Sequence, residues 1–129
     1  MGALIADAAQ IAALRVWFKN EFLTKENVYM GEVWNDPDKF QRTREGRTFT
    51  HDLKVMGLDS RRNQVVVNAT WKVSDQAQVK ITPQRGHQVK LTIKKAGEST
   101  VTVSSGKISR KLTVIAEYRD GSMRVEIRQ

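Results

Sequence analysis

The sequence is informative first through the residue types that it lacks. It has no cysteine, two prolines and eight glycines among 129 residues. The absence of cysteine excludes a fold that is stabilised by disulfide bonds, and it excludes a structural zinc site with cysteine ligands. The few prolines and glycines exclude collagen-like and proline-rich linker chains. Hydrophobic residues make up 40% of the chain, which is enough to build a core, so general disorder is not expected.

Long apolar runs are also missing. No stretch reaches the roughly 18 apolar residues that a membrane-spanning helix needs. The first residues do not read as a secretory signal, because no basic segment precedes the apolar run and Asp7 interrupts it. We therefore expect one compact domain, or one domain with an appendage, and no transmembrane segment.

Positive charge is concentrated in the second part of the chain. Residues 1–45 carry six basic and seven acidic side chains, a net charge of −1. Residues 46–129 carry sixteen basic and seven acidic side chains, a net charge of +9. A turn-forming run, Asn35-Asp36-Pro37-Asp38, lies near this change. The sequence thus predicts an N-terminal helix and connecting segment over 1–45 and a globular domain over 46–129.

The N-terminal segment has a helical spacing of apolar residues. These residues recur at three- and four-residue steps: Ala8, Ile11, Leu14, Phe18 and Phe22. Good helix formers are frequent between them, so we expect an amphipathic helix over about residues 7–25. A lone helix of this length is marginal in water. It would therefore pack on the following domain or serve as a docking or oligomerisation helix. Residues 28–34 fit either a short strand or a loop.

After residue 46 the spacing of apolar residues changes to two. Apolar and polar residues alternate over seven segments: 48–55, 65–73, 79–81, 89–93, 100–104, 112–116 and 125–127. Such alternation is typical of strands with one face in a core and the other in water. Turn signals separate the segments, and Asp120-Gly121 is a strong hairpin signal. About seven strands without intervening helices predict a mainly β fold, an antiparallel sandwich or barrel.

Several motifs within residues 46–116 resemble a known family. They are Gly46 before the strand Thr48–Val55, the tryptophan strand Ala69-Thr70-Trp71-Lys72-Val73-Ser74-Asp75, the strand Val79-Lys80-Ile81, and the Thr/Val-rich segment Lys94–Val103 with its glycine. In these motifs the chain resembles the bacterial immunoglobulin-like domains of group 2, the invasin- and intimin-type module of surface proteins and of some phage structural proteins. The resemblance implies an immunoglobulin-like β-sandwich. It also implies a bacterial cell-envelope or secreted protein whose leader is absent from this chain, with a virion as the alternative.

Strand parity assigns structural places to three residues. Trp71 has inward parity, so we expect it to be the central aromatic residue of the core. Gly97 lies where the chain turns tightly into the next strand, and glycine adopts positive φ easily. His51 also has inward parity, which predicts a structural histidine at the edge of the core.

Residue patterns for catalysis or cofactor binding are not found. The two histidines have no metal-ligand spacing. Ser104-Ser105-Gly106-Lys107 reads as a turn rather than a phosphate-binding loop. Asp36 and Asp38 are too few for a calcium site. We therefore expect a protein that is not an enzyme and that has no catalytic residue, metal site or cofactor; a small enzyme would need a pocket of convergent polar groups.

The basic excess is the remaining functional signal. If several basic side chains share one sheet face, they form a surface that attracts polyanions such as nucleic acid, lipopolysaccharide or wall phosphate. The alternative is a solubilising surface of interspersed charges. The candidate polyanion contacts are Lys90, Lys94, Lys95, Arg110, Lys111, Arg124 and Arg128. Nucleic acid is not expected among these partners, because no aromatic residue alternates with basic residues on an outward face.

Two functions are therefore expected. The first is a non-catalytic immunoglobulin-like structural or adhesion module that contacts proteins or surface glycans; this rests on the resemblance and on the absence of a catalytic set. The alternative is a basic module that binds a polyanion.

Overall fold

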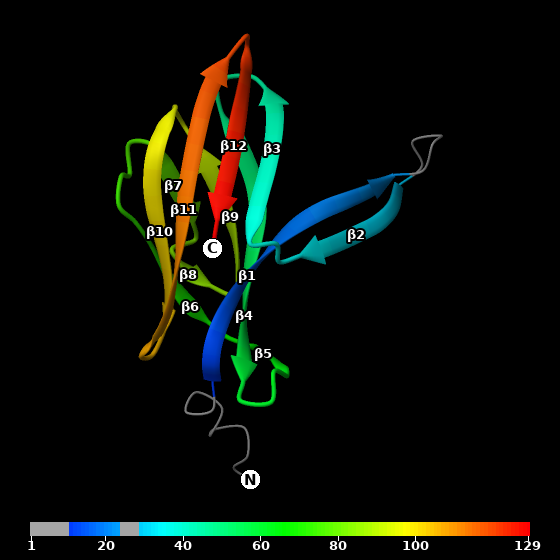
Figure 1. Ribbon diagram of the computed structural model, residues 1–129, viewed down its shortest axis with the longest axis vertical. Coiled ribbons are helices and arrows are strands. Elements are labelled where there is room, and N and C mark those ends of the chain that lie inside the picture. Colours follow the sequence, from blue (N-terminus) through cyan, green and yellow to red (C-terminus); the bar gives the residue numbers. More distant parts are fainter. Residues whose placement is uncertain (1–10, 24–28) are drawn as a thin grey trace.

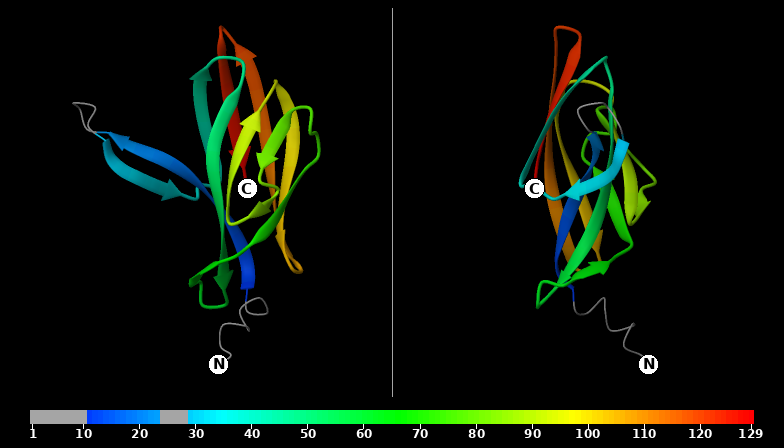
Figure 2. Two further views of the ribbon diagram at one scale, coloured as in Figure 1. Left: turned by 180° about the vertical axis from the view of Figure 1, so that it is seen from behind. Right: turned by 90° about the vertical axis from the view of Figure 1, so that its right-hand side faces the viewer.

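The fold is a sandwich of two antiparallel β-sheets. The computed structural model describes residues 11–23 and 29–129, which contain twelve strands. Each sheet has six strands, and the two sheets face each other across one core (Figures 1 and 2). The predicted mainly β, antiparallel sandwich is therefore confirmed, with more strands than the expected seven.

The first sheet, sheet I, has the strand order β2-β1-β4-β9-β7, and β5 pairs with β4 at one end. Its strands are β1 (Ile11–Leu23), β2 (Tyr29–Asn35), β4 (Phe49–Asp59), β5 (Gln64–Val66), β7 (Val79–Thr82) and β9 (Gln88–Ile93). The view from behind in Figure 2 looks onto this sheet.

The second sheet, sheet II, has the order β3-β12-β11-β10-β6-β8 and lies in front in Figure 1. Its strands are β3 (Lys39–Glu45), β6 (Ala69–Val73), β8 (Arg85–Gly86), β10 (Gly97–Ser105), β11 (Ile108–Arg119) and β12 (Ser122–Arg128). Strand β3 forms one edge of this sheet through its pairing with β12.

Strand β1 shows that the predicted N-terminal helix is wrong over residues 11–23. The first half of β1 pairs with β4 and its second half pairs with β2. Leu14, Val16 and Phe18 are buried at every second position, as in a strand with one face in a core. Leu14 and Phe18 fit a helical spacing equally well, and pairing with β4 overrides the helix propensity of the segment. The remaining parts of the predicted helix, residues 7–10 and 24–25, lie outside the described residues.

The boundary predicted after residue 45 does not separate a helical appendage from the sandwich. Strand β1 in sheet I and strand β3 in sheet II both precede it, and both pair with strands that follow it. The segment that fitted a strand or a loop forms β2 over its described residues. The β1–β2 hairpin extends sideways from the sandwich (Figure 1). The sandwich therefore begins at least as early as Ile11.

One core lies between the sheets and contains the residues that parity placed inward. Trp71 is 2% exposed, which confirms its predicted burial. His51 is 7% exposed and lies near the rings of Phe40 and Phe49, which confirms a histidine at the core edge. The rings of Phe18 and Phe40 stack with centroids 4.3 Å apart and join the first strand to the edge of sheet II.

Two predicted turns are also confirmed. Asp120 and Gly121 connect β11 to β12 and have φ values of 53° and 80°, the left-handed conformation that a two-residue hairpin turn requires. Gly97 has φ of 142° at the start of β10. A Cβ atom there would lie 3.3 Å from the side chain of Gln78, so glycine suits this position for its conformation and for its small size.

Candidate anion-binding face and cleft

The predicted polyanion contacts do not share one face. Lys111, Arg124 and Arg128 lie on the outer side of sheet II, and Lys90 lies on the outer side of sheet I. Lys94 and Lys95 lie in the turn after β9, and Arg110 lies near Arg15 of β1. The single surface that the sequence suggested is thus divided between two opposite faces.

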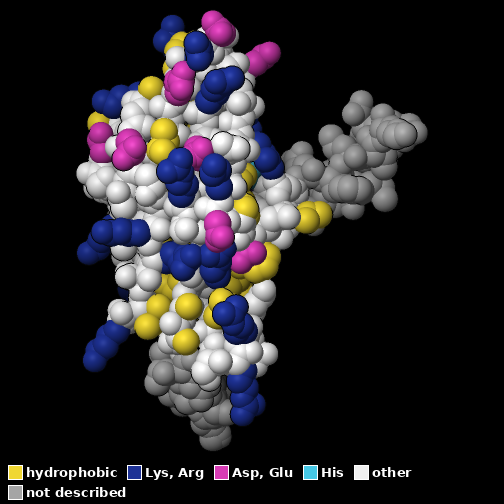
Figure 3. Space-filling view, in the orientation of Figure 1, with side chains coloured by type: hydrophobic (Ala, Val, Ile, Leu, Met, Phe, Trp, Pro, Cys, Tyr) yellow, Lys and Arg dark blue, Asp and Glu magenta, His cyan; other side chains and the backbone are white. Residues whose placement is uncertain are grey.

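The outer face of sheet II carries charges of both signs. Glu117 lies directly opposite Arg124, and Glu126 Oε2 lies 2.5 Å from Nε of Arg128. A hydrogen bond from Gln41 and then the nearby Arg128 hold the pKa of Glu126 below its ordinary value. Figure 3 shows basic and acidic side chains interspersed over this face. The interspersed, solubilising surface that was the alternative prediction describes sheet II.

The outer face of sheet I gathers lysines from four neighbouring strands. In the order β1, β4, β9, β7 they are Lys19, Lys54, Lys90 and Lys80, and we call this surface the basic face. Directly opposed residues of antiparallel strands share a face, and Asp52 of β4 is opposite Lys90. The Asp52 carboxylate also lies 3.5 Å from Nζ of Lys19. Among the side chains that the structure describes on this face of the four strands, one carboxylate accompanies four lysines, which gives this part of the surface a net positive charge.

Two tryptophans interleave with these lysines. Trp34 of β2 is opposite Lys19, and Trp17 of β1 is opposite Lys54. Nζ of Lys54 lies 4.5 Å from the centroid of the Trp34 ring, within the range of a cation–π interaction. Nucleic acid was not expected as a partner because no aromatic residue was predicted to alternate with basic residues on an outward face, and this prediction is wrong. The helix predicted over residues 7–25 had concealed the outward parity of Trp17.

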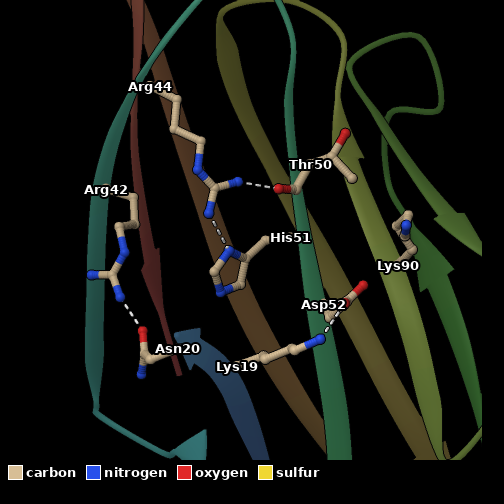
Figure 4. Close-up of a pocket in the computed structure, with 8 residues that line it drawn as sticks. All are labelled: Lys19, Asn20, Arg42, Arg44, Thr50, His51, Asp52 and Lys90. Atoms are coloured by element: carbon tan, nitrogen blue, oxygen red, sulfur yellow. Dashed lines mark hydrogen bonds and ion pairs between the residues drawn. The ribbon is translucent and has the colours of Figure 1, made fainter. Parts of the chain in front are cut away.

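A cleft opens beside the basic face, between the edge strand β3 and strand β4 (Figure 4). We call it the Arg44 cleft, and its volume is about 530 Å³. Its lining residues are Lys19, Asn20, Arg42, Arg44, Thr50, His51, Asp52 and Lys90. Four of these side chains are cationic and one is a carboxylate, so the cleft continues the positive surface of sheet I toward sheet II.

The two arginines reach the cleft because they have inward parity on β3, the same parity as the buried Phe40. The Arg44 guanidinium lies 4.5 Å from the centroid of the Phe49 ring. It donates hydrogen bonds to the carbonyl oxygen of Thr50 and, at 2.8 Å, to Nδ1 of His51. Sequence analysis missed Arg42 and Arg44 because residues 41–47 read as a polar connection, and only the position of β3 at a sheet edge turns them toward the core.

His51 lies at the base of the cleft, and its protonation follows from its surroundings. Burial, and then the positive charge of Arg44, lower the pKa of His51 to about 4, so the imidazole is neutral at pH 7. An arginine N–H can only donate, so Nδ1 accepts and the ring proton is assigned to Nε2. Nε2 is buried and makes no hydrogen bond of normal geometry among the described residues, although an interaction with the backbone of Lys19 raises the pKa of His51 in part. A neutral imidazole surrounded by cationic donors suits the binding of an anion.

The buried imidazole predicts that the fold loses stability in mild acid. His51 takes up a proton near pH 6.5 in an unfolded chain and near pH 4 in the folded one, so the unfolded state binds more protons between these values. Stability is therefore complete above about pH 6.5 and falls by roughly 3 kcal/mol toward pH 4. Chemical denaturation from pH 7 to pH 4.5 measures this loss. His51→Gln should remove it and His87→Gln should keep it; equal pH dependence in the His51→Gln variant and the unmodified chain contradicts the assignment.

A second charged cluster holds β1 to the turn between β2 and β3. Arg15 donates to the carboxylates of Asp36 and Asp38, each at 3.1 Å. The side-chain amide of Gln129 binds the backbone N–H and C=O of Val16. Arg110 lies near this cluster, and burial and then the charge of Arg15 lower the pKa of Arg110. Arg110 is therefore half-buried beside this cluster, where its Nε has no hydrogen-bond partner among the described residues, and it does not join the basic face.

The described residues contain no metal site and no membrane-spanning helix, and comparisons with known proteins find no relative. Among residues 11–23 and 29–129, no group of three or more His, Cys, Asp or Glu could hold a metal ion, and no helix could cross a membrane. No protein-family model, no curated protein and no solved structure matches the chain. The resemblance to group 2 immunoglobulin-like domains therefore stays a prediction.

Proposed function

We propose that this protein is a non-catalytic β-sandwich module that binds a polyanion on the basic face of sheet I. The observation that carries the proposal is the gathering of four lysines from four neighbouring strands on the outer face of sheet I. On sheet II, Glu117 and Glu126 lie beside Arg124 and Arg128, although Lys72 and Lys111 lie opposite Thr102 rather than a carboxylate. On sheet I, four neighbouring strands present four lysines around Asp52 among the described side chains. A surface of one sign raises the local concentration of the opposite charge and accelerates binding.

The spacing of these lysines suits a chain of phosphate or sulfate groups. They lie on neighbouring strands, which are about 4.8 Å apart in a sheet, and Lys54, Lys90 and Lys80 are each offset from the next by two residues along the strands. Trp17 and Trp34 add partly exposed rings beside Lys54 and Lys19. Aromatic rings beside basic side chains are typical of surfaces that bind single-stranded nucleic acid. This favours a nucleic acid strand over a sulfated glycan as the partner.

Charge reversal on the two faces tests the proposal with matched variants. Binding to a fluorescent oligothymidylate of roughly 16 nucleotides and to heparin is measured at rising salt. We expect Lys80→Glu/Lys90→Glu to lower the affinity for the oligonucleotide at least roughly tenfold and the salt slope by roughly 1.4, because each lysine on a phosphate contributes about 0.7 for a single strand.

The control is Lys111→Glu/Arg124→Glu, which makes the same change of charge on sheet II. Equal loss of affinity in both variants would show that net charge, rather than the basic face, governs binding. Affinity that does not fall with salt would overturn the proposal, because the release of counterions requires that dependence. Tighter binding to heparin than to the oligonucleotide would identify a sulfated glycan as the partner.

The structural or adhesion module implied by the family resemblance is the second candidate. The observation that favours it is the β1–β2 hairpin, which extends sideways from the sandwich (Figure 1). An isolated two-stranded hairpin is marginally stable in water, and contact with a neighbouring protein would stabilise it. An unmodified chain that binds neither polyanion probe would favour this candidate, acting by protein contact.

A further inference from the structure

We propose that the Arg44 cleft binds one tetrahedral oxyanion, a phosphate or sulfate group, between Arg42, Arg44 and the Nε2–H of His51. This proposal rests on the proposed function, because the polyanion that binds the basic face brings the phosphate or sulfate group to the cleft. Lys19 and Lys90 belong to both surfaces, so a chain lying across sheet I reaches the cleft without crossing a neutral surface. The cleft is then the place where one charged group of that chain is held specifically.

The charges and donors of the cleft fit an oxyanion. Its four cations outnumber its one carboxylate, and that carboxylate, on Asp52, lies beside Lys19 at the sheet I side. Guanidinium groups match the oxygen spacing of phosphate and sulfate, and two of them come from alternate positions of β3, on the same face of the strand. In Figure 4 the Arg44 side chain extends from β3 toward β4, and the Arg42 side chain runs along β3 toward Asn20 of β1.

A second observation, independent of charge, is the unused donor of His51. The side chain is 7% exposed, and within the described part of the chain its Nε2 makes no hydrogen bond of normal geometry. The backbone of Lys19 interacts with the ring only enough to raise its pKa against the larger lowering effects of burial and Arg44. A buried N–H without an acceptor is costly, so an acceptor is expected. In Figure 4 this nitrogen lies on the side of the ring away from Arg44 and faces the space beside Arg42 and Asn20. An oxygen of a bound oxyanion would supply the acceptor.

Protection of the sheet edge explains only part of this arrangement. Inward-pointing charges on an edge strand discourage pairing with other chains, and the Arg42 guanidinium lies 4.9 Å from the centroid of the Phe40 ring. Neither role gives the Nε2–H of His51 an acceptor in normal hydrogen-bond geometry. For an anion to reach Nε2, Arg42 exchanges its hydrogen bond to the Asn20 oxygen for one to the anion. Asn20 still donates to Asn35, at 2.6 Å.

Titration with inorganic phosphate tests the cleft alone. The ¹⁵N-labelled protein is titrated at pH 7 and constant ionic strength, and the ring nitrogens of His51 and the guanidinium of Arg44 are followed by NMR. We expect saturable shifts at both groups. The pKa of His51 should also rise on saturation, because a bound anion stabilises the imidazolium. The anion opposes the positive charges that face the ring, Arg42 and Arg44 from β3 and Lys19 from β1, and its negative charge acts in the same direction as the carboxylate of Asp52.

Two variants and a control separate this site from general attraction. Arg42→Gln and Arg44→Gln should each raise the phosphate dissociation constant roughly tenfold or more. If one of these variants does not fold, the other still tests the cleft. Arg124→Gln on sheet II removes one positive charge and should change nothing. Shifts that do not saturate, or an equal effect of Arg124→Gln, would overturn the proposal.

The outcomes also distinguish this proposal from the polyanion function. Loss of phosphate binding in the cleft variants with heparin and oligonucleotide binding intact supports the cleft and leaves the basic face standing. Phosphate that binds without changing His51 overturns the cleft while polyanion binding survives. Saturable phosphate binding without any polyanion binding supports the cleft and overturns the basic face. Tighter binding of a 5′-phosphorylated than of an unphosphorylated oligothymidylate shows that the cleft holds the end of a chain. If the two bind equally, weaker oligonucleotide binding by Arg42→Gln shows that the cleft holds an internal phosphate, and unchanged binding shows that it holds a free ion.

Discussion

Deleting residues 1–34 is expected to leave a chain that no longer folds cooperatively. The deletion removes β1 and nearly all of β2, and β1 lies inside sheet I between β2 and β4. The backbone of β4 would lose its pairing over residues 53–59. An exposed strand of this length is prone to pair with other chains, so the truncated protein should aggregate as well as unfold.

The magnitude of this effect follows from the buried side chains of β1. Leu14, Val16 and Phe18 are at most 1% exposed. Truncation of a buried Leu or Phe to alanine alone costs about 2–5 kcal/mol, and a whole domain is stable by only about 5–15 kcal/mol. Loss of all three side chains therefore consumes most of the stability, before the lost pairing is considered.

Circular dichroism and thermal melting of the truncated chain measure the outcome. Phe18→Ala in the full chain gives a graded version, with an expected loss of about 3–5 kcal/mol. Ala12→Ser, at an exposed position of the same strand, is the control and should cost less than about 0.5 kcal/mol. A truncated protein with unchanged melting would show that the N-terminal segment is dispensable and that β1 is not part of the core.

The contrast between β1 and the later strands shows which information the sequence carries locally. From residue 48 onward, alternation predicts strands, and most of these strands and the Asp120-Gly121 turn are confirmed. The segment 65–73, which was expected to be one strand, is divided into β5 of sheet I and β6 of sheet II. In β1, Leu14 and Phe18 satisfy both the helical and the strand period. The decision depends on β4, whose register partners lie about 40 residues away. Local propensity cannot contain that information.

The candidate site was less predictable than the fold for a related reason. Parity correctly turned Lys90 outward and His51 inward. It could not tell which strands become neighbours, and the basic face exists because β1, β4, β9 and β7 are adjacent in that order. The inward arginines of β3 depend on an edge position that only sheet II defines. A surface assembled from strands that are distant in the sequence can therefore be predicted only when the strand order is known. Whether a single side chain points inward or outward follows from the alternation within its own strand.

Trp71→Ala is expected to cost about 3–5 kcal/mol of unfolding free energy, the range for a buried large aromatic side chain. Trp71 is 2% exposed, and its Nε1 donates to the carbonyl oxygen of Gly86 at 3.1 Å. Its backbone N–H also binds the carbonyl oxygen of Gln84. Truncation therefore opens a cavity and leaves the carbonyl of Gly86, on the strand β8 that pairs with β6, without this donor.

Trp34→Ala is the matched control, because it makes the same substitution on the outer face of sheet I. Trp34 is only partly buried, and its described interaction is with Lys54, so its loss should cost below about 1 kcal/mol. Trp71→Phe should fall between the two, since it keeps an aromatic ring in the core but removes the indole donor, a loss of about 1 kcal/mol for the hydrogen bond. Urea denaturation of the three variants gives the order. Equal costs for the two alanine variants would mean that Trp71 is not the central aromatic residue of this core.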